Sequence, residues 1–224
     1  MTNLVLVRHG ETIWHAENRY AGTSDIALTP RGYEQAELLA DWARTAGLDA
    51  IWVSPLLRAR ETVAAAAHAT GLTPHVDARL RELDFGQAER RTVAEMEFLF
   101  PEAIAAYRAD PVAHHLPGGE DPRDAVERAV ACFEEITRLY PGGRVLVVMH
   151  TTLIRLALCR LIGLPLERYR SVFPFVRNGA ITEIQLDGER ASLLEYNAPI
   201  SPSTAPVRTR FAEEVFDKWI EDNA

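Results

Sequence analysis

Short apolar runs alternate along most of the chain with longer segments in which apolar residues recur at helical spacing. The runs at 4–7, 50–53 and 145–149 have the length of strands and are continuously apolar, as strands buried on both faces are. Four segments between and after them carry helix start or stop signals: 29–47, 55–71, 121–143 and 152–163. This alternation predicts an α/β fold, with a mainly parallel central sheet and helices on both faces.

The predicted helix and hairpin ends carry specific signals. Thr29 and Pro30 are typical of an N-cap and a first helical residue, and Gly47 is typical of a helix stop. Near the end of the sheet region, apolar runs at 180–186 and 191–196 flank an Asp-Gly pair. This pattern predicts a hairpin at the sheet edge.

Two segments do not follow the alternation of strands and helices. Residues 84–120 carry three prolines and a Gly-Gly pair, which predict an insertion of short helices and loops able to cover a site. In residues 201–224, apolar side chains recur at helical spacing, which predicts an amphipathic helix packed on its own domain or on a partner. We therefore expect one domain over residues 1–200, including a lid at 84–120, and a C-terminal extension.

Composition restricts the classes of function. A chain of 224 residues with 47% hydrophobic positions is an ordinary globular one, large enough for one core. The net charge of -8 disfavours nucleic-acid binding, so a bound anion needs a local basic pocket. Cys132 and Cys159 have neither metal-site nor disulfide spacing, and we expect a reducing cytoplasm. Because charged and imidazole side chains interrupt the longest apolar stretch, at 145–166, we expect neither a membrane span nor export.

Candidate chemistry lies where predicted strands end, because ligands of open α/β sheets gather beyond the carboxyl ends of strands. The first strand runs into Arg8 and His9, and the most apolar strand runs into His150. A single histidine in such a place is often a core residue, but two at equivalent strand ends indicate a shared pocket. Arg58 stands in a first helical turn, where a positive charge opposes the helix dipole unless an anion binds there. Together these side chains would form a cage for a tetrahedral dianion.

The segment Leu6-Val7-Arg8-His9-Gly10-Glu11-Thr12 resembles the signature of the histidine phosphatase superfamily, in its phosphoglycerate-mutase-like branch. The resemblance covers roughly residues 4–196, takes in His150, and continues through five further segments: 18–22, 28–32, 54–59, 80–86 and 117–120.

The resemblance implies a metal-independent phosphomonoesterase that needs no cofactor and hydrolyses a small phosphorylated metabolite. His9 would accept the phosphoryl group as a phosphohistidine, and Arg8, Arg58 and His150 would hold its oxygens. Glu82 would protonate the leaving oxygen and then activate water. The physics is consistent, because a neutral imidazole can attack while neighbouring cations stabilise charge on the transferring oxygens.

Further contacts with phosphate or substrate are expected from four residues: His15, Thr151, Gly22 and Thr23. Position 15 is commonly Asn in the family, and here the imidazole offers a similar hydrogen bond or a titrating group. The distal histidine is usually followed by Gly, whereas here Thr151 narrows the pocket or offers a hydroxyl to the ligand. Arg90 and Arg91 either contact a second anionic group of the substrate or are solvated surface residues.

Two alternative functions stay open. A phosphoglycerate mutase of this family would have a longer insertion rich in basic residues and an Asn shortly after the distal histidine. In this chain, Arg108 is the one Lys or Arg in residues 92–120, and Thr151 and Thr152 follow His150. A noncatalytic member that binds an anion or a partner would be expected to lose one of the five central side chains, and all are present. The expected partners are a small phosphate monoester and, for the assembly, a second copy in a homodimer.

Overall fold

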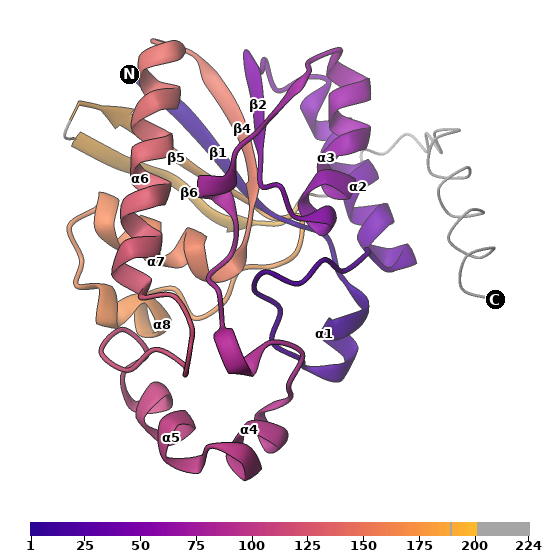
Figure 1. Cartoon of the computed structure of the whole chain (residues 1–224). Coiled ribbons are helices and arrows are strands. Elements are labelled where there is room, and N and C mark those ends of the chain that lie inside the picture. The colour runs from indigo at the N-terminus through magenta and orange to yellow at the C-terminus, as the bar shows by residue number, and fades with distance from the viewer. Residues whose placement is uncertain (189, 201–224) are drawn as a thin grey trace.

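One six-stranded sheet forms the centre of the computed structural model, which describes residues 1–188 and 190–200 (Figure 1). Its strands are β1 (Thr2–Arg8), β2 (Ala50–Val53), β3 (Pro74–Val76), β4 (Arg144–Met149), β5 (Ile181–Asp187) and β6 (Arg190–Ala198). They stand in the order β3-β2-β4-β1-β5-β6. The first four are parallel, β5 is antiparallel to β1, and β6 at the edge is antiparallel to β5. The predicted α/β class and mainly parallel sheet are confirmed. The C-terminal extension at 201–224 lies outside the described residues.

Alternate side chains of the central strands enter two separate cores. On β1, Leu4 and Leu6 belong to one core, and Val5 and Val7 belong to the other. This follows from strand geometry, because successive side chains point to opposite faces of a sheet. A strand buried on both faces must be apolar at every position, which is why these runs are continuous in the sequence.

Two pairs of helices cover the two faces of the sheet. On one face pack α2 (Pro30–Ala43) and α3 (Leu57–Thr70), and on the other pack α6 (Pro122–Leu139) and α7 (Thr151–Leu161), as Figure 1 shows. The apolar stripe of α6 includes Phe133 and Ile136, both fully buried. Between these two layers, the adjacent strands β1 and β4 end side by side at Arg8 and Met149.

Two of the predicted helix-end signals, at Thr29 and Gly71, agree with the structure, and one, at Gly47, does not. Thr29 caps α2 by accepting from the Gly32 N–H at 3.1 Å, and Gly71 ends α3 with a φ of 73°. The predicted stop at Gly47 is wrong, because α2 ends at Ala43 with Arg44 as its cap. Gly47 instead takes a φ of 63° in the connection to β2, so its freedom serves the turn and not the helix end.

Short helices fill the segment that breaks the βα alternation. Residues 84–120 contain η2 (Gly86–Ala88), α4 (Val93–Leu99) and α5 (Pro101–Ala109), which lie at the end of the molecule opposite the N-terminus (Figure 1). Elsewhere the short elements are α1 (Ile13–Glu17), η1 (Ala78–Leu80), η3 (Leu166–Arg168) and α8 (Tyr169–Val172). The sequence pattern predicted none of these four, nor the three-residue strand β3, because each is too short to show a periodicity.

Candidate active site

Two histidines lie side by side where the adjacent parallel strands β1 and β4 end. The strands run in register up to Arg8 and Met149, so the residues that follow, His9 and His150, leave the sheet together. The His9 N–H donates to the Met149 carbonyl oxygen at 3.0 Å, and the two imidazole centroids are 5.2 Å apart. Both side chains are buried. Strand pairing thus brings together two groups that are far apart in the sequence.

Hydrogen bonds fix the tautomer of His9. Its Nδ1 lies 2.7 Å from the Gly10 carbonyl oxygen, which can only accept, so Nδ1 carries the proton. Nε2 is then the nitrogen that carries the lone pair. This lone pair accepts a 3.2 Å hydrogen bond from Nε of Arg58. Burial, and next the charge of Arg58, hold the pKa of His9 well below its usual range. At neutral pH His9 is therefore a neutral imidazole whose reactive nitrogen faces a cation.

Two glycines let the backbone beside His9 reach this position. A Cβ on Gly10 would lie 2.6 Å from the Gly32 carbonyl oxygen, and a Cβ on Gly32 would lie 2.2 Å from the Glu11 carbonyl oxygen. The chain after β1 therefore packs backbone to backbone against the first turn of α2. The Gly10 N–H also donates to Thr62 Oγ1 on α3 at 2.8 Å. Helices from one face of the sheet thus fix the orientation of the histidine.

Arg58 is fully buried in the first turn of α3, as the sequence predicts. Its Nη groups donate to three backbone carbonyls at 2.8 to 3.2 Å: those of Ala21, Gly22 and Ser24. These bonds leave its Nε for His9. The loop at 21–24 therefore holds the guanidinium beside the imidazole, where an anion would meet both.

Glu89 holds the loop that surrounds Arg58. Its carboxylate accepts from the Gly22 N–H at 2.7 Å, from the Thr23 N–H at 3.1 Å and from the Ser24 hydroxyl at 2.8 Å. Gly22 and Thr23 are not among the residues that line the cavity, and their amide groups are already bonded to Glu89. The substrate contact expected of them from the sequence stays a prediction.

Arg8 is a second cation of the site. Its Nη1 donates to the Val176 carbonyl oxygen at 2.6 Å and its Nη2 contacts the His15 ring, while its buried Nε has no partner among residues 1–188 and 190–200. Burial lowers the pKa of Arg8 to about 10, which still leaves it charged at neutral pH. A charged guanidinium with an unsatisfied N–H is suited to binding an anion.

His15 acts as a hydrogen-bond acceptor beside Arg8. Its Nε2 accepts from Nη2 of Arg8, and its Nδ1 lies 2.9 Å from Thr12 Oγ1 and 3.2 Å from the Thr12 carbonyl oxygen, to which it can donate. A neutral ring with its proton on Nδ1 makes both contacts, whereas an imidazolium has no lone pair for Arg8. Burial and the charge of Arg8 lower the pKa of His15 to about 4. Of the two roles open from the sequence, the geometry fits a hydrogen bond and not a group that titrates near neutral pH.

His150 is held by a serine from the neighbouring strand. Its Nε2 lies 2.7 Å from Ser54 Oγ, and its buried Nδ1 has no partner in the described part of the chain. Burial, and next the charge of Arg58, keep the pKa of His150 well below its usual range. A neutral ring with an unpartnered nitrogen beside His9 is available to a ligand.

Glu82 caps the N-terminus of α7. Its Oε2 accepts from the Thr152 N–H at 3.0 Å, and its Oε1 accepts from the N–H groups of Leu153 and Leu83 at 3.1 and 3.0 Å. Glu82 is 2% exposed, yet it lines the same cavity as His9. The helix that follows His150 thus holds a carboxyl group in the cavity that His9 lines.

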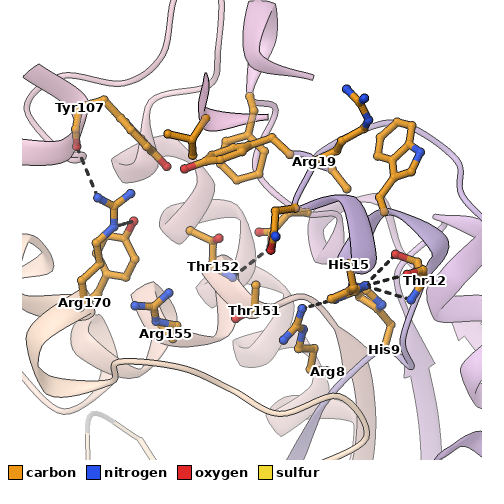
Figure 2. A pocket seen from close by; sticks show the side chains of 18 of the residues that line it. Arg8, His9, Thr12, His15, Arg19, Tyr107, Thr151, Thr152, Arg155 and Arg170 are labelled. Atoms are coloured by element: carbon orange, nitrogen blue, oxygen red, sulfur yellow. Dashed lines mark hydrogen bonds between the residues drawn. The ribbon is translucent and has the colours of Figure 1, made fainter. Parts of the chain in front are cut away.

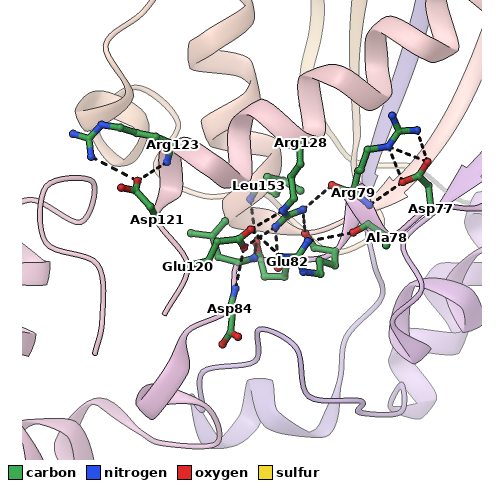
Figure 3. Close-up of polar contacts among 12 residues, drawn as sticks. Asp77, Ala78, Arg79, Glu82, Asp84, Glu120, Asp121, Arg123, Arg128 and Leu153 are labelled. Carbon is green, nitrogen blue, oxygen red and sulfur yellow. Dashed lines mark hydrogen bonds and ion pairs between the residues drawn. The ribbon is translucent and has the colours of Figure 1, made fainter. Parts of the chain in front are cut away.

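Arg128 of α6 fixes the backbone that carries Glu82 (Figure 3). Its guanidinium donates to the carbonyl oxygens of Arg79, Arg81 and Glu82 at 2.6, 2.7 and 3.2 Å. It also pairs with Glu120 through Nε and Nη2, at 2.8 and 2.9 Å. One partly buried ion pair therefore joins α6, the segment before α6 and the backbone at 79–82.

These groups open into a cavity of about 630 Å³ (Figure 2). His9, Arg8, His15, Thr151 and Glu82 line it directly, whereas Arg58 and His150 lie behind the wall, both fully buried. Away from the histidines the wall becomes aromatic and basic, and includes Tyr20, Phe85, Tyr107, Arg155, Tyr169 and Arg170. Five of the expected site residues thus share one cavity, and two more support it from behind.

Two kinds of feature are absent from the described residues. No group of three or more His, Cys, Asp or Glu side chains is arranged to hold a metal ion across residues 1–188 and 190–200. In the same part of the chain, no helix is long and apolar enough to cross a membrane.

Sequence reasoning missed several residues that build the site. Asn178 donates to the His9 carbonyl oxygen at 2.9 Å, and Arg155 and Arg170 line the cavity. None follows a predicted strand or belongs to a quoted motif, so no local signal identified them. Arg90 and Arg91, which the sequence offered for a second anion, are not on the cavity wall, and Arg91 donates to the Gln87 carbonyl oxygen instead.

Comparisons with known proteins agree with this geometry. The family model described as the histidine phosphatase superfamily (branch 1) matches residues 4–199. A probable phosphoglycerate mutase of Citrobacter koseri is 37% identical over 168 residues, which are 74% of this chain and 77% of that protein. Phosphoserine phosphatase 1 of Hydrogenobacter thermophilus is 32% identical over 197 residues, 88% of this chain and 92% of that one. The solved structure of Bacillus stearothermophilus YhfR superimposes with a TM-score of 0.83 at 29% identity, covering 88% of this chain and 98% of that chain.

Proposed function

Because the chain belongs to branch 1 of the histidine phosphatase superfamily, we propose that it is a phosphatase that hydrolyses small phosphate monoesters through a phosphohistidine on His9. The observation that carries this proposal is the neutral His9 ring, whose Nε2 lone pair faces Nε of Arg58. Attack on phosphorus needs a lone pair, and the phosphoryl oxygens need positive charge beside it. Both requirements meet at this one atom.

The phosphoryl group binds between the two arginines and the histidines. Its oxygens accept from the unpartnered Nε of Arg8, from the unpartnered Nδ1 of His150 and from Arg58 Nε, which exchanges its bond to His9 Nε2 for one to the anion. His15 holds Arg8 in place for this contact, and Thr151 adds a hydroxyl on the cavity wall. Two buried nitrogens without a partner in the described residues, Arg8 Nε and His150 Nδ1, thereby gain one, which favours binding of a dianion.

The reaction proceeds in two steps. First, Nε2 of His9 attacks phosphorus, the bond from phosphorus to the ester oxygen breaks, and Glu82 gives its proton to the leaving oxygen. Second, the Glu82 carboxylate takes a proton from water as the water oxygen attacks phosphorus and the P–N bond breaks. Inorganic phosphate leaves, and His9 and Glu82 return to their starting states. The cations Arg8 and Arg58 stabilise the charge on the transferring oxygens in both steps.

A mutase is the second candidate function, because one close relative is named a probable phosphoglycerate mutase. A mutase must hold the phosphoenzyme away from water until a second hydroxyl attacks. The cavity here contains Arg108 as the one basic residue from 92–120. Hydrolysis is therefore the function we favour, and formation of 2-phosphoglycerate from 3-phosphoglycerate is the observation that would support the mutase.

The setting of the reaction completes the proposal. Residues 84–120 act as a lid, since Val93, Tyr107 and Arg108 from this segment line the cavity. The enzyme works in the cytoplasm, where its two buried cysteines stay free thiols. It assembles as a homodimer, which light scattering tests.

The first experiment measures phosphate release from a panel of small phosphomonoesters in EDTA, with wild type and His9→Ala in parallel. Wild type is expected to turn over at least one ester, and His9→Ala none. His68→Ala, which removes an exposed histidine at the far end of α3, is the matched control and keeps wild-type activity.

A second readout follows the intermediate. Rapid acid-free quenching of wild type with substrate is expected to trap an acid-labile phosphoryl group on the chain, visible by mass, and His9→Ala carries none. Turnover retained by His9→Ala, or a requirement for added metal, would contradict the mechanism.

A further inference from the structure

The cavity holds more arginine than a phosphoryl group needs. Arg155 of α7 and Arg170 of α8 line its outer part, and Figure 2 shows them following Arg8 along one side of the cavity. Arg155 lies close enough to Arg8 for its charge to lower the pKa of that guanidinium, and Arg170 acts on Arg155 in the same way. Three like charges in a row repel one another, so this arrangement needs a reason.

The outer arginines differ from the other basic groups of the cavity in having no acidic partner. Arg19 pairs with Glu17 and Glu95, and Arg108 pairs with Glu97. Across residues 1–188 and 190–200, neither Arg155 nor Arg170 has a carboxylate oxygen within 4.0 Å of its guanidinium. No carboxylate therefore forms an ion pair with either guanidinium, although the charge of Glu82 acts on Arg155 from further away.

Aromatic rings and backbone carbonyls hold both guanidiniums in place. Arg155 stacks on the Tyr169 ring at 4.8 Å and donates through Nε to the Phe173 carbonyl oxygen at 2.5 Å. Arg170 stacks on the Tyr107 ring at 4.6 Å and donates through Nε to the Tyr169 hydroxyl at 3.0 Å. In Arg155 both Nη groups are free of hydrogen bonds to the described residues. A guanidinium fixed by stacking, with its terminal N–H groups unused, is prepared to bind an anion.

The spacing along α7 sets the size of the ligand. Arg155 stands one helical turn, about 6 Å along the axis, from Thr151 at the phosphoryl end. The Glu82 carboxyl group, which would protonate the leaving oxygen, caps the same helix at Thr152. The leaving group must therefore pass Glu82 and reach Arg155 within a few bonds.

We propose that Arg155 and Arg170 form a second anion subsite, which selects phosphate monoesters whose leaving group carries a carboxylate or a second phosphate a few bonds from the ester oxygen. This inference rests on the proposed phosphatase function and adds the class of substrate. The planar fork of arginine matches either acid group with two parallel hydrogen bonds.

The test uses pairs of substrates with the same carbon skeleton. 3-Phosphoglycerate and glycerol 3-phosphate differ only in whether carbon 1 is a carboxylate, and fructose 1,6-bisphosphate and fructose 6-phosphate differ by one phosphate. Wild type is expected to favour the more anionic member of at least one pair by about 10- to 100-fold in kcat/KM, as expected for charge-assisted hydrogen bonds. A preference within the first pair indicates that the subsite binds a carboxylate, and a preference within the second pair indicates that it binds a second phosphate.

The variants are Arg155→Gln and Arg170→Gln, with Arg168→Gln as the matched control. Arg168 is exposed in η3, next to α8, and does not line the cavity. The two subsite variants are expected to reduce the preference at least about fivefold while glycerol 3-phosphate is hydrolysed at nearly the wild-type rate, and Arg168→Gln retains the preference. A preference near one in wild type for both pairs, or one unchanged in both variants, overturns the subsite.

A binding measurement separates the subsite from the chemistry. The full-length His9→Ala variant, which is expected not to turn over, is titrated by calorimetry to measure its affinity for each ester. The ligands are the same four: 3-phosphoglycerate, glycerol 3-phosphate, fructose 1,6-bisphosphate and fructose 6-phosphate. If wild type releases no phosphate but the affinity preference is present and lost in Arg155→Gln, the phosphatase proposal fails and the subsite stands. If wild type releases phosphate but shows no preference in affinity or in rate, the subsite fails and the phosphatase proposal stands. If one of the two variants, Arg155→Gln or Arg170→Gln, does not fold, the other is used, since either substitution alone tests the subsite.

Discussion

The two ends of the cavity hold their arginines in opposite ways. Arg58 is fully buried, and backbone carbonyls take its Nη groups so that only Nε faces the reacting histidine. Arg155 and Arg170 are half-buried and stack on tyrosines. Both Nη groups of Arg155 have no hydrogen bond to the described residues, and Nη1 of Arg170 makes one long bond, of 3.5 Å, to the Tyr107 carbonyl oxygen. The buried end can recognise only what every phosphate monoester shares, because its donors point at one place. The outer end is where substrates differ, so changes there alter selectivity and changes at the buried end alter rate.

The largest expected effect tests this division at the buried end. Glu82→Gln removes the transferable proton, and kcat for alkyl phosphates is expected to fall about 100- to 10,000-fold. p-Nitrophenyl phosphate is expected to lose much less, because its leaving group needs no proton. The ratio of kcat/KM between 3-phosphoglycerate and glycerol 3-phosphate stays unchanged, since the proton transfer serves both.

Steady-state kinetics on these three esters measures the effect, with melting curves to confirm folding. An equal loss for p-nitrophenyl phosphate would show that Glu82 acts in some way other than protonating the leaving oxygen.

A smaller effect is expected from the clamp behind Glu82. Arg128→Met removes the bonds to the carbonyls of Arg79, Arg81 and Glu82, so the carboxyl group is expected to lose its fixed position. We expect kcat to fall about 10- to 100-fold with KM within a few-fold, because a misplaced catalytic group affects the transition state more than substrate binding.

The control for this clamp is Arg138→Met, which removes an exposed arginine of the same helix. Arg128→Lys keeps the positive charge but not the full set of hydrogen bonds, and is expected to recover part of kcat. A variant that raises KM without lowering kcat would assign Arg128 to substrate binding instead of positioning.

The smallest effect concerns pH. Burial lowers the pKa of His15 to about 4, against 6.5 for an unperturbed histidine. Between these values the unfolded chain binds a proton that the folded chain does not, so the free energy of unfolding falls as the pH falls from about 6.5 toward 4. His15→Asn removes this contribution, and its melting temperature is expected to drop less than that of wild type between pH 7 and pH 5.

Thermal unfolding followed by circular dichroism at the two pH values measures the difference, with His68→Ala as the exposed control. His9 and His150 have pKa values lowered in the same direction, so some acid sensitivity remains in the variant. An equal drop in wild type and His15→Asn would mean that the His15 ring is not neutral in the folded protein.

The sequence by itself determined the sheet and the chemical groups at its centre. Continuous apolar runs predict buried strands, and residues that follow such strands meet at one sheet edge, which is how His9 and His150 could be paired without coordinates. The position of Arg58 in a first helical turn was likewise readable, because a cation there conflicts with the helix dipole. These features depend on local periodicity and on rules that hold for all parallel sheets.

Only the tertiary structure decided which nitrogen of His9 is free, where Gly22 and Thr23 lie, and which arginines reach the outer cavity. Each depends on a contact between segments distant in the chain, such as Arg58 with the carbonyls of 21–24, or Arg170 with Tyr107 from the lid segment. Local sequence does not encode such contacts, because they arise from how whole helices pack. Periodicity therefore fixes where a strand ends, whereas packing fixes what each side chain beyond that end is left free to bind.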